Sequence, residues 1–270
     1  MRNSSIDGGI APRVELRDVN MRYFSREGET EALKGISFSV AAGEFVAIIG
    51  QSGCGKSTLL SLVSGILKPT GGTVLVDGKA VTGPSRKVAY MLQQDYLFEW
   101  RTILENAVLG AEIQGADMDK ARARAKELLT KYGLGQFLFH LPRQLSGGMR
   151  QRVALARTLC TEPDVVLLDE PFSALDSQTR LALADEVTEI LRRERKTAIL
   201  VTHDIGEAIS MAERVIVLSR RPGQIKSEHA IRFGSCGSGV RLTTFAARNA
   251  PEFNGYFNTL WQELEVHVEG

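Results

Sequence analysis

The chain has 270 residues, enough for one large domain that buries a substantial core. Hydrophobic residues make up 43% of it and charged residues 24%, which are ordinary values for a globular protein. The net charge of +1 argues against a protein that is held to nucleic acid mainly by bulk positive charge, so no nucleic-acid partner is expected.

At the N-terminus, residues 1–13 lack the apolar core of a secretory signal. No later stretch approaches the roughly 18 uninterrupted apolar residues of a transmembrane helix. The three cysteines are far apart and odd in number, which is typical of a reducing compartment. The chain alone is therefore expected to be cytoplasmic, and a role at the membrane requires a partner.

The first third of the chain predicts strands of two kinds. Apolar and polar residues alternate in Val14–Leu16, Ile36–Val40 and Thr73–Asp77, which is typical of half-exposed antiparallel strands. Phe45–Ile49 is apolar throughout, as in a strand that is covered on both faces, and Lys56–Leu67 has the pattern of a helix. An antiparallel β subdomain beside a buried sheet is expected.

Farther along, short apolar runs alternate with helix-like stretches, which predicts an α/β fold with a mostly parallel sheet. The expected strands are Val88–Leu92, Val165–Leu168, Ala198–Thr202 and Val215–Leu218, and the expected helices are Gln151–Cys160, Gln178–Glu194 and Ile205–Ala212.

Two segments depart from this alternation. Ile103–Gln114 and Asp119–Tyr132 are consecutive predicted helices with no strand between them, which indicates a helical insertion. Near the C-terminus, a Gly/Ser-rich stretch at Gly234–Gly239 precedes a short predicted helix near Phe253–Leu264. The predicted parts are a domain over 13–228, a helical subdomain inserted into it at about 95–150, and a C-terminal extension over 229–270.

A glycine-rich loop follows directly on the strand Phe45–Ile49 and reads GQSGCGKST, which matches the pattern G-x-x-x-x-G-K-[ST]. Its glycines let backbone N–H groups wrap around phosphates at the start of a helix. Lys56 is placed to reach the β- and γ-phosphates, and the Ser57 hydroxyl is placed to bind Mg²⁺. The sequence therefore predicts nucleotide binding by Gly50, Gln51, Ser52, Gly53, Cys54, Gly55, Lys56, Ser57 and Thr58.

A second anion-binding motif, LSGGMRQR, occupies residues 145–152 and leads into a helix. The Ser146 hydroxyl and the unobstructed N–H groups of Gly147 and Gly148 suit a helix N-terminus that binds phosphate. A chain with one nucleotide loop does not need two such sites. The motif, Gln151 included, is therefore predicted to bind the nucleotide of another subunit.

Two acidic residues, Asp169 and Glu170, follow the buried strand Val165–Leu168. Ligands of open parallel sheets bind at this carboxyl edge. Asp169 is predicted to hold Mg²⁺, and Glu170 is predicted to orient or deprotonate the attacking water.

Further polar residues are predicted at the same site. His203 ends another buried strand beside Asp169 and is placed to contact the γ-phosphate. Gln93 and Gln94 follow a third strand, and either amide suits Mg²⁺ or water. The ring of Tyr23 suits stacking on adenine.

In this order the motifs closely resemble those of the ATP-binding-cassette (ABC) ATPases, from about residue 13 to residue 225. GQSGCGKST is similar to their Walker A loop, LSGGMRQR to their signature, VVLLDEP to their Walker B motif and SALD to their D-loop. His203 matches their switch histidine and Tyr23 their adenine-stacking aromatic. The resemblance implies a head-to-tail dimer that sandwiches two ATP molecules, with Asp176 of the D-loop near the interface.

A finer resemblance is to the ATPases of nitrate, sulfonate and taurine importers. It rests on Trp100-Arg101-Thr102, on HDIGEA at 203–208 and on RPGQI at 221–225. In such importers the coupling glutamine lies seven positions before a tryptophan, which selects Gln93 over Gln94. Gln93 is then the third predicted Mg²⁺ ligand, beside Ser57 and Asp169.

The resemblance implies ATP-driven uptake of a small solute, with ATP and Mg²⁺ as cofactors. The implied partners are a second copy of the chain, integral-membrane permease subunits and, indirectly, an extracytoplasmic solute-binding protein. The chain is then expected at the inner face of the cell membrane, held there by its permease. The basic pair Arg220-Arg221 is expected to form a solvated turn.

One alternative stays open at this point. A non-transport ABC ATPase, as in iron–sulfur cluster assembly, has the same single-cassette size and also lacks membrane spans. A chromosome or repair ATPase of this class needs a long coiled-coil insertion between Walker A and the signature, and the spacing leaves no room for one.

Overall fold

The computed structural model describes residues 11–26, 28–173, 175–234 and 242–265. Its centre is a six-stranded sheet in the order β10-β9-β3-β8-β7-β6, in which all neighbours pair in parallel except β10 and β9. This confirms the predicted α/β fold with a mostly parallel sheet. The strands are β3 (Phe45–Ile49), β6 (Val88–Met91), β7 (Val165–Asp169), β8 (Thr197–Thr202), β9 (Arg214–Leu218) and β10 (Ile225–Ala230).

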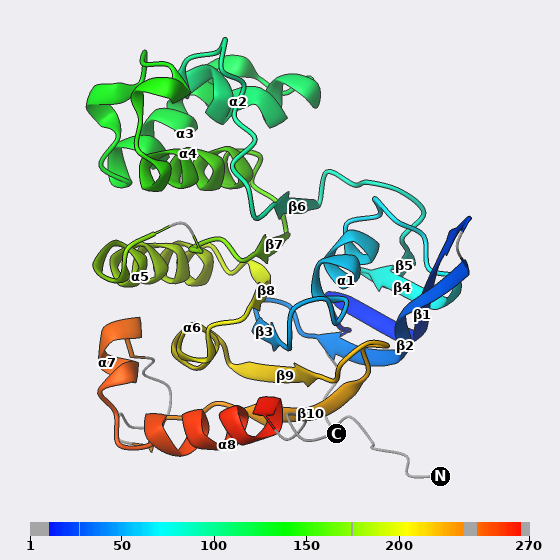
Figure 1. Ribbon diagram of the computed structural model, residues 1–270. Helices are drawn as coiled ribbons and strands as arrows, with labels where there is room; N and C mark the ends of the chain where they lie inside the picture. The colour runs from blue at the N-terminus through cyan, green and yellow to red at the C-terminus, as the bar shows by residue number, and fades with distance from the viewer. Residues whose placement is uncertain (1–10, 27, 174, 235–241, 266–270) are drawn as a thin grey trace.

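A second sheet of four antiparallel strands lies beside the first, in the order β2-β1-β4-β5 (Figure 1). It is the predicted antiparallel subdomain. Its strands are β1 (Val14–Ser25), β2 (Gly28–Val40), β4 (Gly71–Val76) and β5 (Lys79–Ala80).

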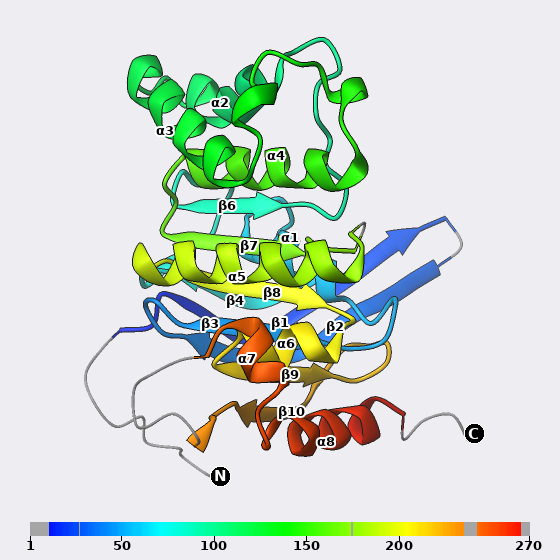
Figure 2. The same cartoon turned by 90° about the vertical axis from the view of Figure 1, so that its left-hand side faces the viewer.

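The helices form separate groups (Figures 1 and 2). α1 lies between the two sheets, and α5 and α6 lie along the opposite face of the central sheet. α7 packs on α5 and α6, and α8 packs on α6 beside β10. α2, α3 and α4 pack on one another as a helical layer beyond β6. The bounds are α1 (Lys56–Val63), α2 (Ile103–Ile113), α3 (Met118–Lys131), α4 (Gly147–Cys160), α5 (Ser177–Arg193), α6 (Ile205–Met211), α7 (Thr244–Arg248) and α8 (Phe253–Glu265), with 3₁₀ turns at Gly135–Phe137 and Pro142–Gln144.

Alternate side chains of the central strands divide the interior into two cores. In β3, Val46 and Ile48 pack with α1 and the antiparallel sheet. Ala47 and Ile49 pack in the other core with α5 and α6. Because side chains on both faces of the central strands are buried, the apolar runs of the sequence coincide with these strands.

Several elements differ from the sequence prediction. The hairpin of β1 and β2 is longer, since pairing continues to Ser25 opposite Gly28. α1 ends at Val63 rather than Leu67, because Gly65 takes a positive φ of 79°. β5, β10 and α7 were not predicted. Residues 235–239 of the Gly/Ser-rich stretch, and Cys236 within it, lie outside the described residues.

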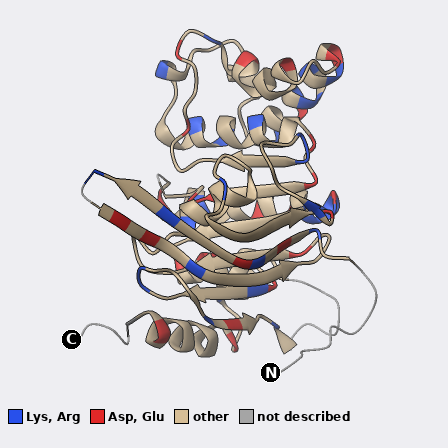
Figure 3. Cartoon of the chain, turned by 90° about the vertical axis from the view of Figure 1, so that its right-hand side faces the viewer, with Lys and Arg blue, Asp and Glu red and all other residues tan. Residues whose placement is uncertain are grey.

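The hairpin surface carries charges of both signs (Figure 3). Arg22 pairs with Glu29 at 3.0 Å and with Glu31 at 3.1 Å, and Arg17 pairs with Glu15 at 2.7 Å. Exposed pairs of this kind contribute little to stability, but they give this surface a mixed charge. In the described part of the chain, each helix is too short or too polar to cross a bilayer.

Candidate nucleotide-binding site

A cleft of about 650 Å³ lies at the carboxyl edge of the central sheet, where the segments that follow β3, β7 and β8 meet. It brings together residues that were predicted from separate parts of the sequence. Thr30, Ala32 and Arg221 also line it and were not predicted. The predicted residues in its lining are Tyr23, Ser52, Gly53, Gly55, Lys56, Ser57, Thr58, Gln93, Glu170 and His203.

The phosphate loop begins where β3 ends, and its backbone requires glycine at residue 55. Gly55 has a φ of 105°, and a Cβ there would lie 2.9 Å from the carbonyl oxygen of Ala32. Gly55 also precedes the first turn of α1, whose N–H groups have no partner within the helix. Lys56 Nζ donates to the carbonyl oxygens of Gly50 at 2.8 Å and Gln51 at 3.1 Å. The result is a helix N-terminus with an amine beside it, which suits an anion.

Cys54 is buried under this loop rather than in the cleft. Its sulfur lies against Gly50, where a Cβ would approach to 2.7 Å. Burial raises the pKa of the Cys54 thiol, so the thiol stays protonated at neutral pH. Cys54 therefore packs under the loop.

The turn after β9 is hydrogen-bonded to the phosphate loop. Arg220 Nε donates to Gln51 Oε1 at 2.7 Å, and Arg221 Nε donates to the carbonyl oxygen of Gly53 at 3.2 Å. Both arginines are exposed, as expected of a solvated turn. The expectation missed their hydrogen bonds to the phosphate loop, because these join residues that are distant in the sequence.

Asp169 is buried at the carboxyl end of β7. Tyr90 of the neighbouring strand β6 donates its hydroxyl to Asp169 Oδ2 at 3.0 Å, and the Ser57 hydroxyl also hydrogen-bonds to this carboxylate. Burial raises the pKa of Asp169, although the hydrogen bonds from Ser57 and Tyr90 oppose the rise. Burial also raises the pKa of Tyr90, which therefore stays a donor.

The side chains around Asp169 fit a magnesium ion. Ser57, Asp169 and Gln93 offer a hydroxyl, a carboxylate and an amide oxygen, and Mg²⁺ prefers such hard oxygen ligands. Among the described residues, no group of three or more His, Cys, Asp or Glu could hold a metal. A site with one carboxylate is nevertheless typical of Mg²⁺, which usually keeps waters and substrate phosphates in its coordination sphere.

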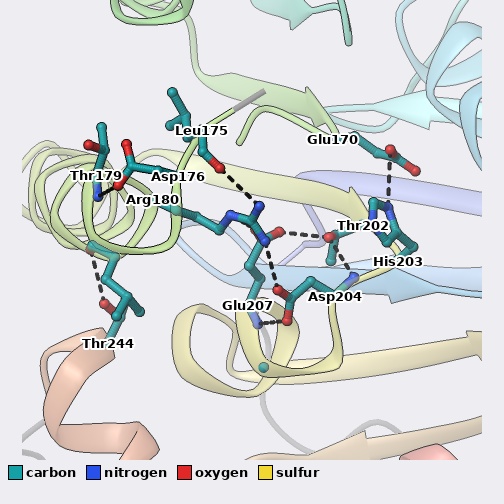
Figure 4. A network of polar contacts seen from close by, with 12 residues as sticks. Glu170, Leu175, Asp176, Thr179, Arg180, Thr202, His203, Asp204, Glu207 and Thr244 are labelled. Carbon is teal, nitrogen blue, oxygen red and sulfur yellow. Dashed lines mark hydrogen bonds and ion pairs between the residues drawn. The ribbon is translucent and has the colours of Figure 1, made fainter. Parts of the chain in front are cut away.

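One oxygen of the Glu170 carboxylate has two side-chain partners, of which His203 is seen in Figure 4. Gln93 Nε2 donates to Glu170 Oε2 at 3.0 Å, and His203 Nδ1 lies 3.2 Å from the same oxygen. Glu170 has a φ of 46°, a conformation that is rare for glutamate, and its N–H donates to the carbonyl oxygen of Val201 at 2.8 Å. Such backbone outliers are typical of functional sites.

Arg180, which was not predicted, connects the D-loop with the segment after β8 (Figure 4). It donates to the carbonyl oxygen of Leu175 at 3.1 Å and to Asp204 at 3.2 Å. Asp176, the predicted D-loop residue, accepts from the first N–H groups of α5 and caps that helix. Ala174 of the same motif lies outside the described residues.

The signature residues do not line the cleft among the described residues, because α4 belongs to the helical layer (Figure 1). Ser146 caps α4 by accepting from the N–H of Met149 at 3.3 Å. Around Gly147 there is space for a side chain, since a Cβ there would meet only an arginine Nη2 at 3.9 Å. Gln151 is 3% exposed and donates to the carbonyl oxygen of Gln93 at 3.0 Å, so its side chain contacts its own chain.

If Asp169 holds a metal ion, replacing Tyr90 by Phe should weaken metal binding about tenfold, because the hydroxyl that orients the Asp169 carboxylate is lost. Metal-free nucleotide binding should stay unchanged. Titration with Mn²⁺ in the presence of ATP, followed by electron paramagnetic resonance, measures the affinity. Tyr132→Phe is the matched control, since Tyr132 is also buried and its hydroxyl has no partner among the described residues. Parental Mn²⁺ affinity in the Tyr90 variant would contradict this role.

Relatives with named activities match almost the whole chain. The taurine import ATP-binding protein TauB of Burkholderia pseudomallei is 42% identical over 256 residues, which cover 94% of this chain and 97% of that protein. The nitrate import ATP-binding protein NrtD of Synechocystis sp. is 40% identical over 243 residues, which cover 90% of this chain and 91% of that protein.

A solved dimeric structure of an ATP-binding cassette, in a post-hydrolysis state bound to ADP and Pi, aligns with a TM-score of 0.74 and 35% identity. The alignment covers 81% of this chain and 99% of that chain. The family model described as ABC transporter matches residues 33–173, more than half of the sequence. The resemblance predicted from the motifs is confirmed, and the chain belongs to the ABC transporter family.

Proposed function

We propose that the chain is the ATP-hydrolysing subunit of an ABC importer for a small solute such as nitrate, a sulfonate or taurine. The observation that carries the ATPase assignment is the group of Gln93, Glu170 and His203 in one cleft with the phosphate loop. The importer assignment is supported by relatives that are named as nitrate and taurine import ATP-binding proteins.

ATP is bound through its triphosphate by the backbone N–H groups of the phosphate loop and by Lys56. The Tyr23 ring stacks on adenine, and its hydroxyl lies 3.1 Å from Thr58 Oγ1, which holds the ring at the cleft. Glu170 accepts a proton from the water that attacks the γ-phosphorus, while His203 contacts the γ-phosphate. The bond to the bridging oxygen breaks, and ADP and phosphate leave.

The oxygen atoms around Asp169 are the proposed magnesium ligands. Ser57, Gln93 and Asp169 hold Mg²⁺, which when bound offsets the charge of the phosphates. Tyr90 fixes the Asp169 carboxylate toward that position. Little covalent chemistry is required of the protein, because positioning and electrostatics dominate phosphoryl transfer.

A second copy completes each site. Its Ser146, Gly147 and Gly148 contact the γ-phosphate of the nucleotide that the first copy binds. Support comes from the open helix start at Gly147, from the placement of α4 in a different layer from α1, and from the dimeric state of the similar cassette. Asp176 of the D-loop lies near the interface of this dimer.

An exposed aromatic surface beside Gln93 is the proposed contact for the integral-membrane permease. Tyr96 is 58% exposed and Trp100 is 75% exposed, and Trp100 stacks on Phe98 with ring centroids 4.8 Å apart. Exposed aromatic clusters of this kind mark protein contact sites. Docking here holds the chain at the inner face of the cell membrane and connects it only indirectly to an extracytoplasmic solute-binding protein.

The same surface is tied to both halves of the proposed ATP site. The Gln93 side chain contacts Glu170, and the Gln93 carbonyl oxygen accepts from Gln151 of the signature helix. Arg157, also on α4, donates to the carbonyl oxygen of Tyr96 at 2.9 Å. Closure of the nucleotide site therefore moves the aromatic surface, which is the proposed route from ATP to the permease.

The test is an affinity purification of the Glu170→Gln variant from gently solubilised native membranes, with ATP and Mg²⁺ present. A multi-span membrane protein is the expected partner. Adding Trp100→Asp should abolish its recovery while ATP binding persists, since a buried charge opposes docking. Phe139→Asp is the matched control, because Phe139 is a 77% exposed aromatic elsewhere in the helical layer.

Recovery of soluble partners only would contradict the importer proposal. It would favour the alternative, a non-transport ABC ATPase of the iron–sulfur assembly kind, and would leave the ATPase chemistry intact. If a permease is recovered, its solute-binding protein can be titrated with nitrate and sulfonates, taurine among them, to define the solute.

A further inference from the structure

The C-terminal helix α8 reaches the phosphate loop through the side chain of Gln51. Gln51 Nε2 donates to the carbonyl oxygen of Leu264, in the last turn of α8, at 2.9 Å. Gln51 Oε1 accepts from Arg220 Nε at 2.7 Å. Both ends of this amide are thus used outside the cleft. The motif predicts that Gln51 binds ATP, but its side chain instead joins the phosphate loop to α8.

The main chain of Gln51 faces the nucleotide side. Lys56 Nζ donates to the carbonyl oxygens of Gly50 and Gln51. These two carbonyl oxygens leave one of the three ammonium protons of Lys56 free, so a triphosphate that accepts more than one proton from Lys56 displaces Gly50 or Gln51. Nucleotide binding at Lys56 therefore acts next to the main chain of the same residue whose side chain holds α8.

A pocket provides a second connection between α8 and the ATP site. It has a volume of about 390 Å³, and Gln51 and His203 line it together with the aromatic side of α8. On that side, Phe257 and Trp261 are stacked with ring centroids 6.0 Å apart. Trp261 thus shares one cavity with a phosphate-loop residue and with the histidine of the cleft.

α8 is also anchored independently of Gln51. Leu260 is fully buried. Glu263 accepts from Lys226 Nζ through its carbonyl oxygen at 2.5 Å, and its carboxylate lies 3.0 Å from His229 Nε2 on β10. The helix can therefore support the loop from a fixed position beside β10.

We propose that Gln51 is a positioning residue that couples nucleotide occupancy of the phosphate loop to α8. The inference rests on the proposed role of residues 50–58 in ATP binding. Through Gln51, α8 holds the loop in the geometry that binds a triphosphate. In return, ATP binding changes the surroundings of Trp261. The C-terminal extension thereby becomes part of the ATPase and can sense its nucleotide state.

The chain offers a direct probe, because it contains only two tryptophans. In a Trp100→Phe background, Trp261 is the sole indole fluorophore. Addition of ATP and Mg²⁺ is expected to change the Trp261 emission of this full-length protein. Binding of a fluorescent ATP analogue, measured in the same samples, reports nucleotide occupancy separately.

Adding Gln51→Leu is expected to remove most of the emission change while nucleotide binding persists. The KM for ATP should rise about twofold to tenfold with kcat little changed, because Leu can make neither of the two hydrogen bonds of the Gln51 amide and the phosphate loop is less well positioned. Gln51→Glu is a second variant, since it keeps an acceptor for Arg220 but loses the donor to Leu264. Gln262→Leu is the matched control, because it makes the same change at an exposed position of α8 itself.

The experiment distinguishes failure of the coupling from failure of the ATP site. If nucleotide binds and the Trp261 emission does not respond, or responds equally in the Gln51→Leu protein, the coupling is refuted while the proposed ATPase function stands. If the Trp100→Phe protein binds no nucleotide and Lys56→Met changes nothing, the ATP site itself is wrong and the coupling fails with it.

Discussion

Replacing Glu170 by Gln is expected to lower kcat for ATP hydrolysis by about 10²- to 10⁴-fold while ATP still binds. Gln keeps the size of the side chain and leaves an oxygen for the Gln93 amide to contact, but it cannot take a proton from the attacking water. The loss therefore falls on the chemical step. Phosphate release under saturating ATP measures kcat, and equilibrium dialysis with ATP measures binding.

Glu162→Gln is the matched control for this substitution. Glu162 also has a positive φ, 50° compared with 46° at Glu170, and it is exposed outside the cleft. The same chemical change on a similar backbone conformation should leave hydrolysis at the parental rate. Parental hydrolysis in the Glu170 variant would refute its role as the base.

A second large effect on ATP hydrolysis is expected at the site that two copies of the chain are proposed to form together. Lys56→Met and Gly147→Asp are each expected to abolish hydrolysis, one by removing the phosphate-binding amine and the other by placing a carboxylate where phosphate binds. An equal mixture should regain roughly a quarter of the parental rate, because half of the dimers are mixed and each of these has one intact site.

Gly147 is replaced rather than Gly148 because there is room for a side chain at Gly147. A side chain there meets only the end of Arg150, whereas a Cβ on Gly148 would lie 2.9 Å from Leu175 in the same chain. A control mixture combines Lys56→Met with the Lys56→Met/Gly147→Asp double variant, which yields no intact site. A first mixture no more active than this control would mean that the signature does not complete a partner's site.

The central strands could be predicted closely because burial on both faces leaves an uninterrupted apolar run. Phe45–Ile49 is predicted and observed with the same bounds. β10 has no such pattern, since Ile225–Ala230 alternates between half-buried and exposed residues at the edge of the sheet. The hairpin tip was missed for a similar reason: pairs such as Tyr23 opposite Thr30 are exposed, so the strands continue there without a buried apolar pattern.

The candidate site was also predictable only in part. Lys56, Glu170 and His203 could be placed in one cleft because parallel strands end at one edge and each motif follows a strand. Tyr90 could not, since its role depends on the register that sets β6 beside β7. The direction of the Gln51 side chain depends on α8, which lies more than two hundred residues away in sequence, and no local pattern encodes that contact.

The placement of the signature helix in a different layer from the phosphate loop affects reaction order. In the proposed two-copy site, a free copy has a phosphate loop without a signature partner, so dilute subunits should hydrolyse ATP at a rate that rises with the square of their concentration. A permease that binds two copies makes their encounter intramolecular, at an effective concentration of about millimolar. With the proposed two-copy site and permease, unassembled subunits should consume little ATP, and most hydrolysis should take place in complete transporters.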